Sequence, residues 1–311
     1  MPLDFQPTTD PEGRNAYSPI GEPLMTDVWY VADQSRRLKR GRPRETDICG
    51  GLLMLQREKS GAVTGRFDGA PAEVAERDGL VWFYYPGNQC RVNAPPAPPP
   101  LKCPKGGVRY CHTVTIPASQ DDAAYGLLDP AHTPFVHKSP LWRGNGVHKL
   151  KTKPFEPNDF GWTMMPHAPV NSDIYKLIGG QIRVRIEFRL PGLRAEFIEN
   201  KVHTVLGLTA LTPIDARNTR LRQIFFWNSP ILNLLQPVAP LVAGPFLDQD
   251  VDIMELRRKN EAFNPGKGTL VGDSDRQFLW YLAVKKAWQK ARAEGTAFKN
   301  PHKAQTLQWK T

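Results

Sequence analysis

The sequence predicts an α+β fold, with a small N-terminal β domain followed by a C-terminal antiparallel sheet on which helices pack. Three observations support this prediction. Short aromatic and β-branched runs dominate residues 27–85, apolar and polar side chains alternate strictly at 181–190 and 220–227, and helical spacing is confined to 119–137 and the C-terminal third. Such alternation is typical of an antiparallel sheet with one buried face.

The N-terminal β domain, residues 27–92, is expected to be a truncated unit. Residues 1–26 are polar and proline-rich, and we expect them to form an arm. Strands are predicted at 27–31, 46–49, 52–56 and 80–85, with only polar loops between the last two. Because about 60 residues with three or four strands are marginally stable alone, this domain should pack against the rest of the chain.

A proline-rich linker, residues 93–104, separates this domain from a larger C-terminal domain at 105–311. Consecutive prolines cannot supply a sheet ladder and favour extended geometry. We interpret the segment as an interdomain spacer, and a ligand for a proline-reading module is the alternative. The elements predicted beyond the linker are a strand at 110–116 and helices at 119–137, 245–262 and 274–293.

Composition narrows the class of protein. The net charge is +10, with basic clusters at 36–44 and 285–292, but neither cluster carries the interleaved aromatic residues of a nucleic-acid module. No stretch approaches the ~20 apolar residues of a membrane span, and four scattered cysteines do not form a disulfide framework. We therefore expect a cytoplasmic protein without nucleic-acid or membrane partners.

The residues with the most evident chemistry lie in the motif Asp129-x-x-His132-x-x-x-x-His137. On a helix Asp129 and His132 share a face, whereas His132 and His137 do not. Pro134 interrupts the hydrogen-bond ladder between the histidines and allows His137 to be aimed toward His132. Two imidazoles with nearby carboxylates suit ferrous iron. The alternative is a pair of hydrogen-bonded core histidines.

A third ligand is predicted at Asp250. On a helix this carboxylate falls beside Leu247, Val251 and Met254, whereas Asp248 projects to the other side. An ionised carboxylate among apolar side chains is costly unless a cation compensates it. A plain surface acid is the alternative. His132, His137 and Asp250 together would form the two-histidine, one-carboxylate face that binds ferrous iron.

In this order along the chain, the residues resemble the catalytic α subunits of Rieske-type non-haem iron oxygenases. The resemblance covers most of residues 27–311. The matching residues are the Asp129–His137 motif, Asp250 with Glu255 five positions later, Trp29-Tyr30-Val31 and Asp78-Gly79-Leu80-Val81-Trp82. The resemblance implies a helix-grip-like catalytic domain, Fe²⁺ held by His132, His137 and Asp250, and an oligomer based on trimers.

One feature of that family is missing. Its subunits carry a Cys-x-His and a Cys-x-x-His that bind a [2Fe–2S] cluster, whereas this sequence has no histidine before His112. The resemblance then implies that electrons from NAD(P)H arrive through a partner with a Rieske cluster, either a reductase or a sister oxygenase subunit. Asp129 would be the electron-transfer bridge. Similar members are the methylxanthine N-demethylase components that lack their own Rieske domain.

The implied activity is oxidative N-demethylation or O-demethylation of a small aromatic or heterocyclic substrate. The alternatives are an aromatic ring hydroxylase, a non-catalytic subunit of an oxygenase complex, and a binding module for a hydrophobic ligand. The expected pocket walls are inward side chains of the sheet, which in most proteins are plain core. They are Met164, Met165, Phe188, Phe197, His203, Phe225 and Trp227.

Overall fold

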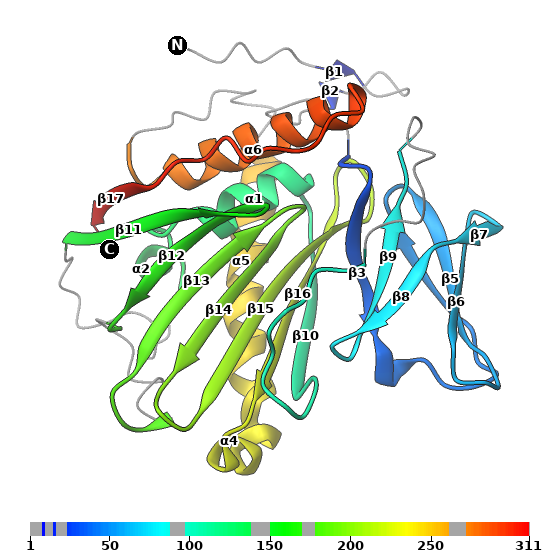
Figure 1. Ribbon diagram of the computed structural model, residues 1–311, viewed down its shortest axis with the longest axis horizontal. Helices are drawn as coiled ribbons and strands as arrows, with labels where there is room; N and C mark the ends of the chain where they lie inside the picture. The colour runs from blue at the N-terminus through cyan, green and yellow to red at the C-terminus, as the bar shows by residue number, and fades with distance from the viewer. Residues whose placement is uncertain are drawn as a thin grey trace.

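The computed structural model describes residues 8–9, 15–16, 24–87, 97–137, 150–169, 178–260 and 272–310. The predicted α+β class is confirmed: the largest element is an eight-stranded antiparallel sheet of order β10-β16-β15-β14-β13-β12-β11-β17, with helices on one face (Figure 1). Its strands are β10 (Tyr110–Ile116), β11 (Leu150–Asn158), β12 (Gly161–His167), β13 (Arg183–Arg189), β14 (Leu193–Glu199), β15 (Thr204–Pro213), β16 (Thr219–Trp227) and β17 (Gln305–Lys310).

Two small antiparallel sheets make up the N-terminal β domain. They have the orders β3-β9-β8 and β4-β5-β6-β7. Their strands are β3 (Val28–Gln34), β4 (Arg44–Ile48), β5 (Gly51–Arg57), β6 (Val63–Phe67), β7 (Ala70–Ala72), β8 (Val74–Arg77) and β9 (Leu80–Tyr85), and a separate hairpin pairs β1 (Thr8–Thr9) with β2 (Asn15–Ala16).

The prediction that only loops lie between residues 56 and 80 is therefore wrong, because β6, β7 and β8 occupy this segment. A side chain at Gly65 would meet Val74 Cγ1 at 2.6 Å, so the close approach of β6 to β8 requires glycine. Glycine in mid-strand removes the alternation on which the sequence prediction depended.

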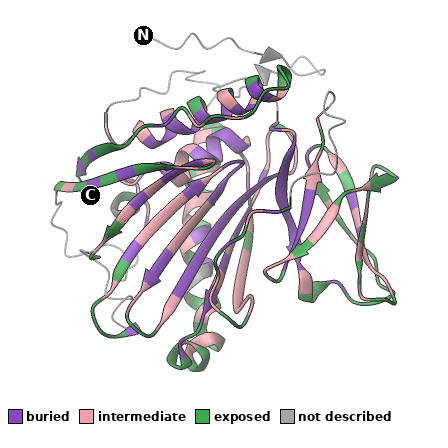
Figure 2. Cartoon of the chain, in the orientation of Figure 1, coloured by how far each residue is buried: buried purple, intermediate pink, exposed green. Residues whose placement is uncertain are grey.

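The small domain packs on the face of the large sheet that the helices leave free. Trp29 and Trp82 form one apolar cluster with Leu206, Leu208 and Phe226 of that sheet. Polar groups fix the junction: Arg222 Nη1 and Thr212 Oγ1 each donate a hydrogen bond to the Val31 carbonyl at 2.9 Å. Figure 2 shows the resulting run of buried residues along β15 and β3.

The helical layer consists of α1 (Gln120–Leu128), α2 (Thr133–Val136), α4 (Pro230–Leu235), α5 (Ala239–Asn260) and α6 (Arg276–Ala293). The prediction of a single helix over 119–137 is wrong, since α1 ends before Asp129 and α2 begins only at Thr133. Asp129 is extended, with φ −75° and ψ 105°, because a residue that precedes proline avoids the helical region. The break thus comes from Pro130. Pro134 occupies the first turn of α2, where a helix does not need the backbone N–H that proline lacks.

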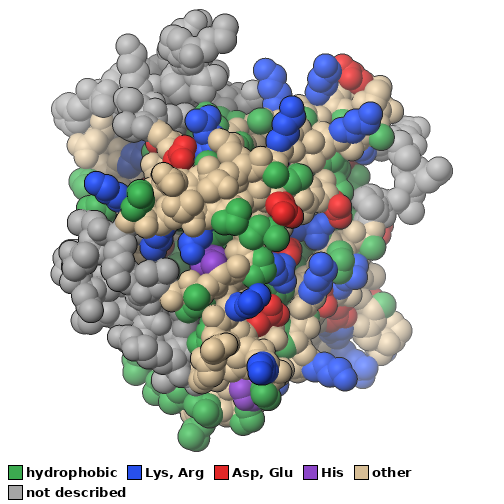
Figure 3. Space-filling model, turned by 60° about the vertical axis from the view of Figure 1, so that its left-hand side comes forward, with side chains coloured by type: hydrophobic (Ala, Val, Ile, Leu, Met, Phe, Trp, Pro, Cys, Tyr) green, Lys and Arg blue, Asp and Glu red, His purple; other side chains and the backbone are tan. Residues whose placement is uncertain are grey.

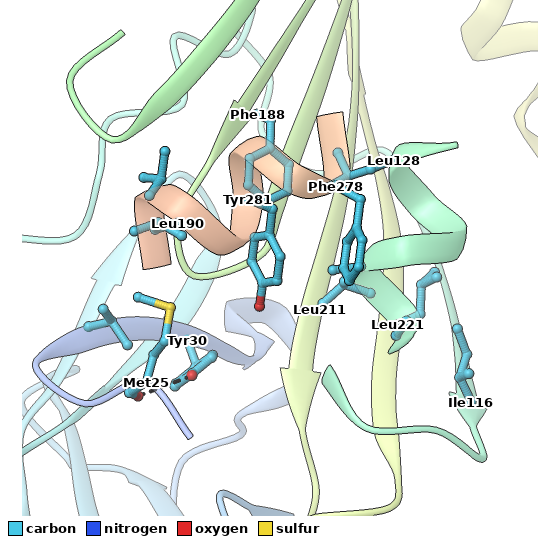
Figure 4. Packing of buried hydrophobic residues seen from close by; sticks show 14 of the residues in the cluster. Met25, Tyr30, Ile116, Leu128, Phe188, Leu190, Leu211, Leu221, Phe278 and Tyr281 are labelled. Atoms are coloured by element: carbon cyan, nitrogen blue, oxygen red, sulfur yellow. Dashed lines mark hydrogen bonds between the residues drawn. The ribbon is translucent and has the colours of Figure 1, made fainter. Parts of the chain in front are cut away.

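Two consecutive acids hold α1 against both long helices. Asp121 binds Lys285 Nζ at 2.7 Å and accepts a hydrogen bond from the Tyr281 hydroxyl, and Asp122 binds Arg257 at 2.7 Å. Lys285 is buried in this pair, so its assignment to a surface basic cluster is wrong. Around Tyr281 the core contains Phe278 of the same helix, Phe188 of β13 and Leu211 of β15 (Figure 4).

We expect Asp121→Asn to lower the free energy of unfolding by about 3–5 kcal/mol, because it leaves the Lys285 ammonium buried without its counter-ion. Urea unfolding followed by circular dichroism measures the loss. The matched control is Asp159→Asn, which changes a side chain that is 87% exposed and 3.9 Å from Arg189; its effect should stay within about 0.5 kcal/mol. Equal effects of the two changes would contradict the assigned role of Asp121.

One helical run in the described part of the chain, Pro230–Asn260, is long and apolar enough to cross a membrane by length and composition. The expectation that no stretch approaches this limit is therefore wrong. The run comprises α4, the 3₁₀ turn η3 (Gln236–Val238) and α5, and only 12% of its apolar window is buried. Leu234 and Leu241 are among its exposed side chains. Hydrophobic side chains gather at the lower end of Figure 3, where Figure 1 places α4.

Candidate metal centre

His132, His137 and Asp250 converge at the junction of α1, α2 and α5. One ligand atom from each lies within 4.8 Å of the other two, and His137 Nε2 is 3.5 Å from Asp250 Oδ1. The two imidazole rings have centroids 5.4 Å apart and an interplanar angle of 70°. The structure thus brings together the three residues that the sequence singled out, although His137 and Asp250 are 113 positions apart.

His132 takes its orientation from the break between α1 and α2. Its Nδ1 approaches the backbone carbonyl of Asp129, so a proton on Nδ1 leaves Nε2 available to a metal. The C-terminal end of α1 is fixed in turn by the start of α6. Tyr125 donates a hydrogen bond to Asp275 at 3.3 Å, and Gln277 Nε2 donates one to the Leu128 carbonyl at 3.3 Å.

His137 is buried, and its Nε2 faces the Asp250 carboxylate at 3.5 Å, which is longer than an ordinary hydrogen bond. Its ring stacks on Phe246 with centroids 3.7 Å apart and planes at 19°. The pKa of His137 is lowered to about 4, mainly by burial and also by the charge of His132, while the Gln249 side chain opposes the shift. The imidazole is therefore neutral at physiological pH, which is the form that binds metals.

Asp250 lies on the face of α5 that meets His137. Leu247 on this face is buried, whereas Asp248 and Asp252 are exposed, in the orientation that helical spacing predicted. Phe246 precedes Asp250 by four residues, so one face of α5 supplies both the stacking ring and the carboxylate. Burial raises the pKa of Asp250 to about 7, because the ionised form lacks a compensating charge.

These properties fit a divalent cation. Two neutral imidazoles and one carboxylate form the donor set of non-haem ferrous sites. A bound cation would supply the charge that the Asp250 carboxylate lacks, and it would take one ring nitrogen of the buried His137 as a ligand. Among the described residues, no other group of three histidine, cysteine or acidic side chains meets the same distance criterion.

Asp129 is partly exposed beside the triad. Its Oδ1 accepts a hydrogen bond from the Ala131 backbone at 2.8 Å, which closes the turn into α2. Burial is the largest cause of the raised pKa of Asp129; the Ala131 hydrogen bond and the His132 charge oppose it, and Asp275 reinforces it. Asp129 therefore neighbours the candidate ligands and lies outside the group of three.

The expected pocket residues fall into separate groups. Met164 lies on the helix-facing side of the sheet, opposite Ile186 of β13, within the same apolar cluster as Leu128 and Leu247. Phe225 and Trp227 belong to another cluster near the end of β16. His203 lies in the turn between β14 and β15, where its backbone N–H binds Asn200, and Phe197 packs toward the N-terminal domain. Their role as pocket walls stays a prediction.

Sequence reasoning missed Phe246 and Arg194. Phe246 could have been found from its i, i+4 spacing to Asp250. Arg194 of β14 lies close enough for its charge to lower the pKa of His132, yet nothing in its local sequence marks it. A cavity of about 210 Å³ lies elsewhere, between α6 and residues 301–305.

Several solved structures share this fold over most of the chain. Dicamba monooxygenase bound to 3,6-dichlorosalicylic acid superposes with a TM-score of 0.65 at 17% identity and covers 88% of this chain and 99% of its own. NdmA of Pseudomonas putida CBB5, a QL mutant with theobromine, gives 0.61 at 11% identity, with 89% and 97% covered. The carbazole-bound oxygenase in a ferredoxin complex of carbazole 1,9a-dioxygenase gives 0.57 at 14% identity, with 90% and 94% covered.

No protein-family model matches the sequence, and no curated protein matches it. At identities of 11–17%, the likeness to solved structures establishes the fold and the extent of the chain that adopts it.

Proposed function

We propose that this chain is the catalytic component of a Rieske-type, multicomponent non-haem iron oxygenase that lacks its own [2Fe–2S] cluster. Its ferrous ion would be held by His132, His137 and Asp250. The observation that carries the proposal is the convergence of these three side chains, with one ligand atom of each within 4.8 Å of the other two. Support also comes from the fold, since the similar solved structures are oxygenases by their names.

The proposed reaction is oxidative demethylation of a small aromatic or heterocyclic compound. When bound, ferrous iron would supply the activation of dioxygen. The chain's own residues provide a neutral His137 held flat against Phe246, a His132 oriented by the Asp129 carbonyl, and a carboxylate on α5. Named ligands of similar structures include dicamba and theobromine, which favours demethylation, and carbazole, which keeps ring hydroxylation as the alternative.

The proposed electron donor is a partner that carries a Rieske cluster, a reductase or a sister subunit, which uses NAD(P)H. Similar structures include complexes of an oxygenase with ferredoxin. In this chain the partner would contact Asp129 and the neighbouring Phe135, whose surface is 69% exposed. We also expect a cytoplasmic oligomer based on trimers.

Reconstitution tests this function. Protein loaded with Fe²⁺ under anaerobic conditions is mixed with NADH, oxygen and a Rieske-bearing reductase, with dicamba and theobromine as probe substrates. We expect oxygen uptake above the reductase background with at least one probe, together with formaldehyde. A reductase without a Rieske domain should support less than about a tenth of that rate. Full turnover with this second reductase would contradict the partner assignment.

A non-catalytic subunit is the second candidate, because the cluster ligands are missing from the sequence. It predicts that iron loading changes neither stability nor oxygen uptake. Against it stands the cost of grouping one buried and one partly buried imidazole with a partly buried carboxylate, which a purely structural subunit would have no reason to keep.

A further inference from the structure

We propose that the helix-facing side of the large sheet contains an anion-binding subsite, built from Lys151, Lys153 and His167, that takes a carboxylate group of an organic ligand. In the oxygenase proposed above this ligand is the substrate, so the inference deepens that function. The binding itself depends on neither iron nor an electron donor.

The two lysines lie on the inward-facing side of β11. On β11, Lys151 and Lys153 alternate with the exposed residues Leu150, Thr152 and Pro154, and they continue in the same direction as the buried Phe155. Lys153 pairs in register with Leu307 of β17, and only 8% of it is exposed. A lysine this buried normally has a partner.

Lys153 has no such partner within the described ranges. Lys285 and Arg222 are the other buried cations there, and each is matched: Lys285 with Asp121 at 2.7 Å, and Arg222 with backbone carbonyls. Among the described residues, neither Lys151 nor Lys153 forms an ion pair or a hydrogen bond, and neither ammonium is completely buried. Two neighbouring ammonium groups that face the same way repel each other, and the charge of Lys151 adds to burial in lowering the pKa of Lys153.

His167 brings a third donor to the same place. It ends β12, the strand next to β11, and its Nδ1 is 3.0 Å from the Met165 carbonyl. Burial is the main cause that lowers the pKa of His167, and the charges of Lys153 and Lys151 lower it further.

The subsite lies on the metal side of the sheet. Glu196 is near enough to raise the pKa of His167, and it pairs with Arg194 at 3.1 Å. Arg194 in turn lies near enough to lower the pKa of His132. Glu196 is already engaged, so the face carries an excess of positive charge that a bound anion would balance. Lysine ammonium groups are compact point charges that suit a carboxylate.

Calorimetric titration of the full-length, metal-free protein tests the subsite. Benzoate is the anionic probe and benzamide is its neutral counterpart of similar shape. We expect benzoate to bind at least tenfold more tightly than benzamide. Lys153→Met should weaken benzoate at least tenfold and leave benzamide within twofold. Lys303→Met, which changes an exposed lysine, should leave both affinities within twofold.

Thermal unfolding without ligand separates a binding role from a structural one. Without a bound anion, the charge of Lys153 is repelled by that of Lys151, which destabilises the protein. Removing the charge in Lys153→Met should therefore leave the unfolding temperature unchanged or raise it. If Lys153→Met is instead destabilised, Lys153→Arg, which keeps the positive charge, is titrated in its place. Tighter binding of benzoate than of benzamide by this variant supports the subsite, and equal binding of the two overturns it.

Three results would overturn the proposal. They are equal affinity for benzoate and benzamide, equal effects of Lys153→Met and Lys303→Met, and tighter binding of inorganic phosphate than of benzoate, which would indicate a site for a small inorganic anion. None of these titrations uses iron or a reductase. Failure of the proposed oxygenase function would therefore be seen separately.

Discussion

Asp250→Ala is expected to lower the affinity of the protein for Fe²⁺ more than about 100-fold and to abolish oxygen-dependent turnover. Changes to groups that only orient a metal ligand already cost about 10- to 100-fold, and this change removes the only carboxylate within 4.8 Å of both imidazoles among the described residues. The affinity is measured by anaerobic titration with Fe²⁺, and turnover by oxygen uptake.

The same helix offers a matched control. Asp248→Ala makes the identical change two residues earlier, on the exposed face of α5. It should leave both iron affinity and turnover unchanged. If the two variants bound iron equally well, Asp250 would be a plain acid whose raised pKa reflects burial alone, and the assignment of the third ligand would be wrong.

Asp129→Asn is expected to retain iron and lose at least about 90% of partner-driven turnover. Asparagine keeps an oxygen that can accept the Ala131 hydrogen bond, and the backbone carbonyl that meets His132 is unchanged. Only the ionisable group is removed, so the loss falls on electron transfer rather than on metal binding. Iron content by plasma spectrometry and oxygen uptake with the Rieske-bearing reductase measure the two effects.

A second oxidant separates electron transfer from positioning. Hydrogen peroxide brings oxygen that is already reduced by two electrons, so turnover driven by peroxide needs no electrons from a partner. Asp129→Asn should keep peroxide-driven turnover near the wild-type level. An equal loss with peroxide and with the reductase would show that Asp129 only positions the iron ligands.

Periodicity predicted much of the fold. The strand at 110–116 coincides with β10, and the helix expected at 274–293 differs from α6 by two residues at its start. These elements carry strong alternation or a clear apolar stripe. The helix expected from Pro245 begins earlier, at Ala239, so Pro245 lies inside α5 and does not mark its start. β17 was not predicted, since an edge strand buries only Leu307 and Trp309.

The side-chain partners were less predictable than the elements. His132 and His137 share one motif, and Asp250 could be added because helical spacing indicates the face it occupies. The pair Asp121–Lys285 spans 164 positions, and Lys285 lies in a sequence that reads as a surface basic cluster. Lys151 and Lys153 occupy a strand whose alternation alone does not distinguish an interior lysine from an exposed one. Such contacts depend on how the layers are stacked.

Iron content tests the central claim most directly. Full-length protein, prepared anaerobically, loaded with Fe²⁺ and freed of excess metal, is assayed for iron per chain beside His137→Ala. We predict about one iron per chain for the wild type and less than about a tenth for the variant, because a ferrous site of this kind needs both imidazoles. A wild-type value below a few tenths that His137→Ala does not change would contradict the account.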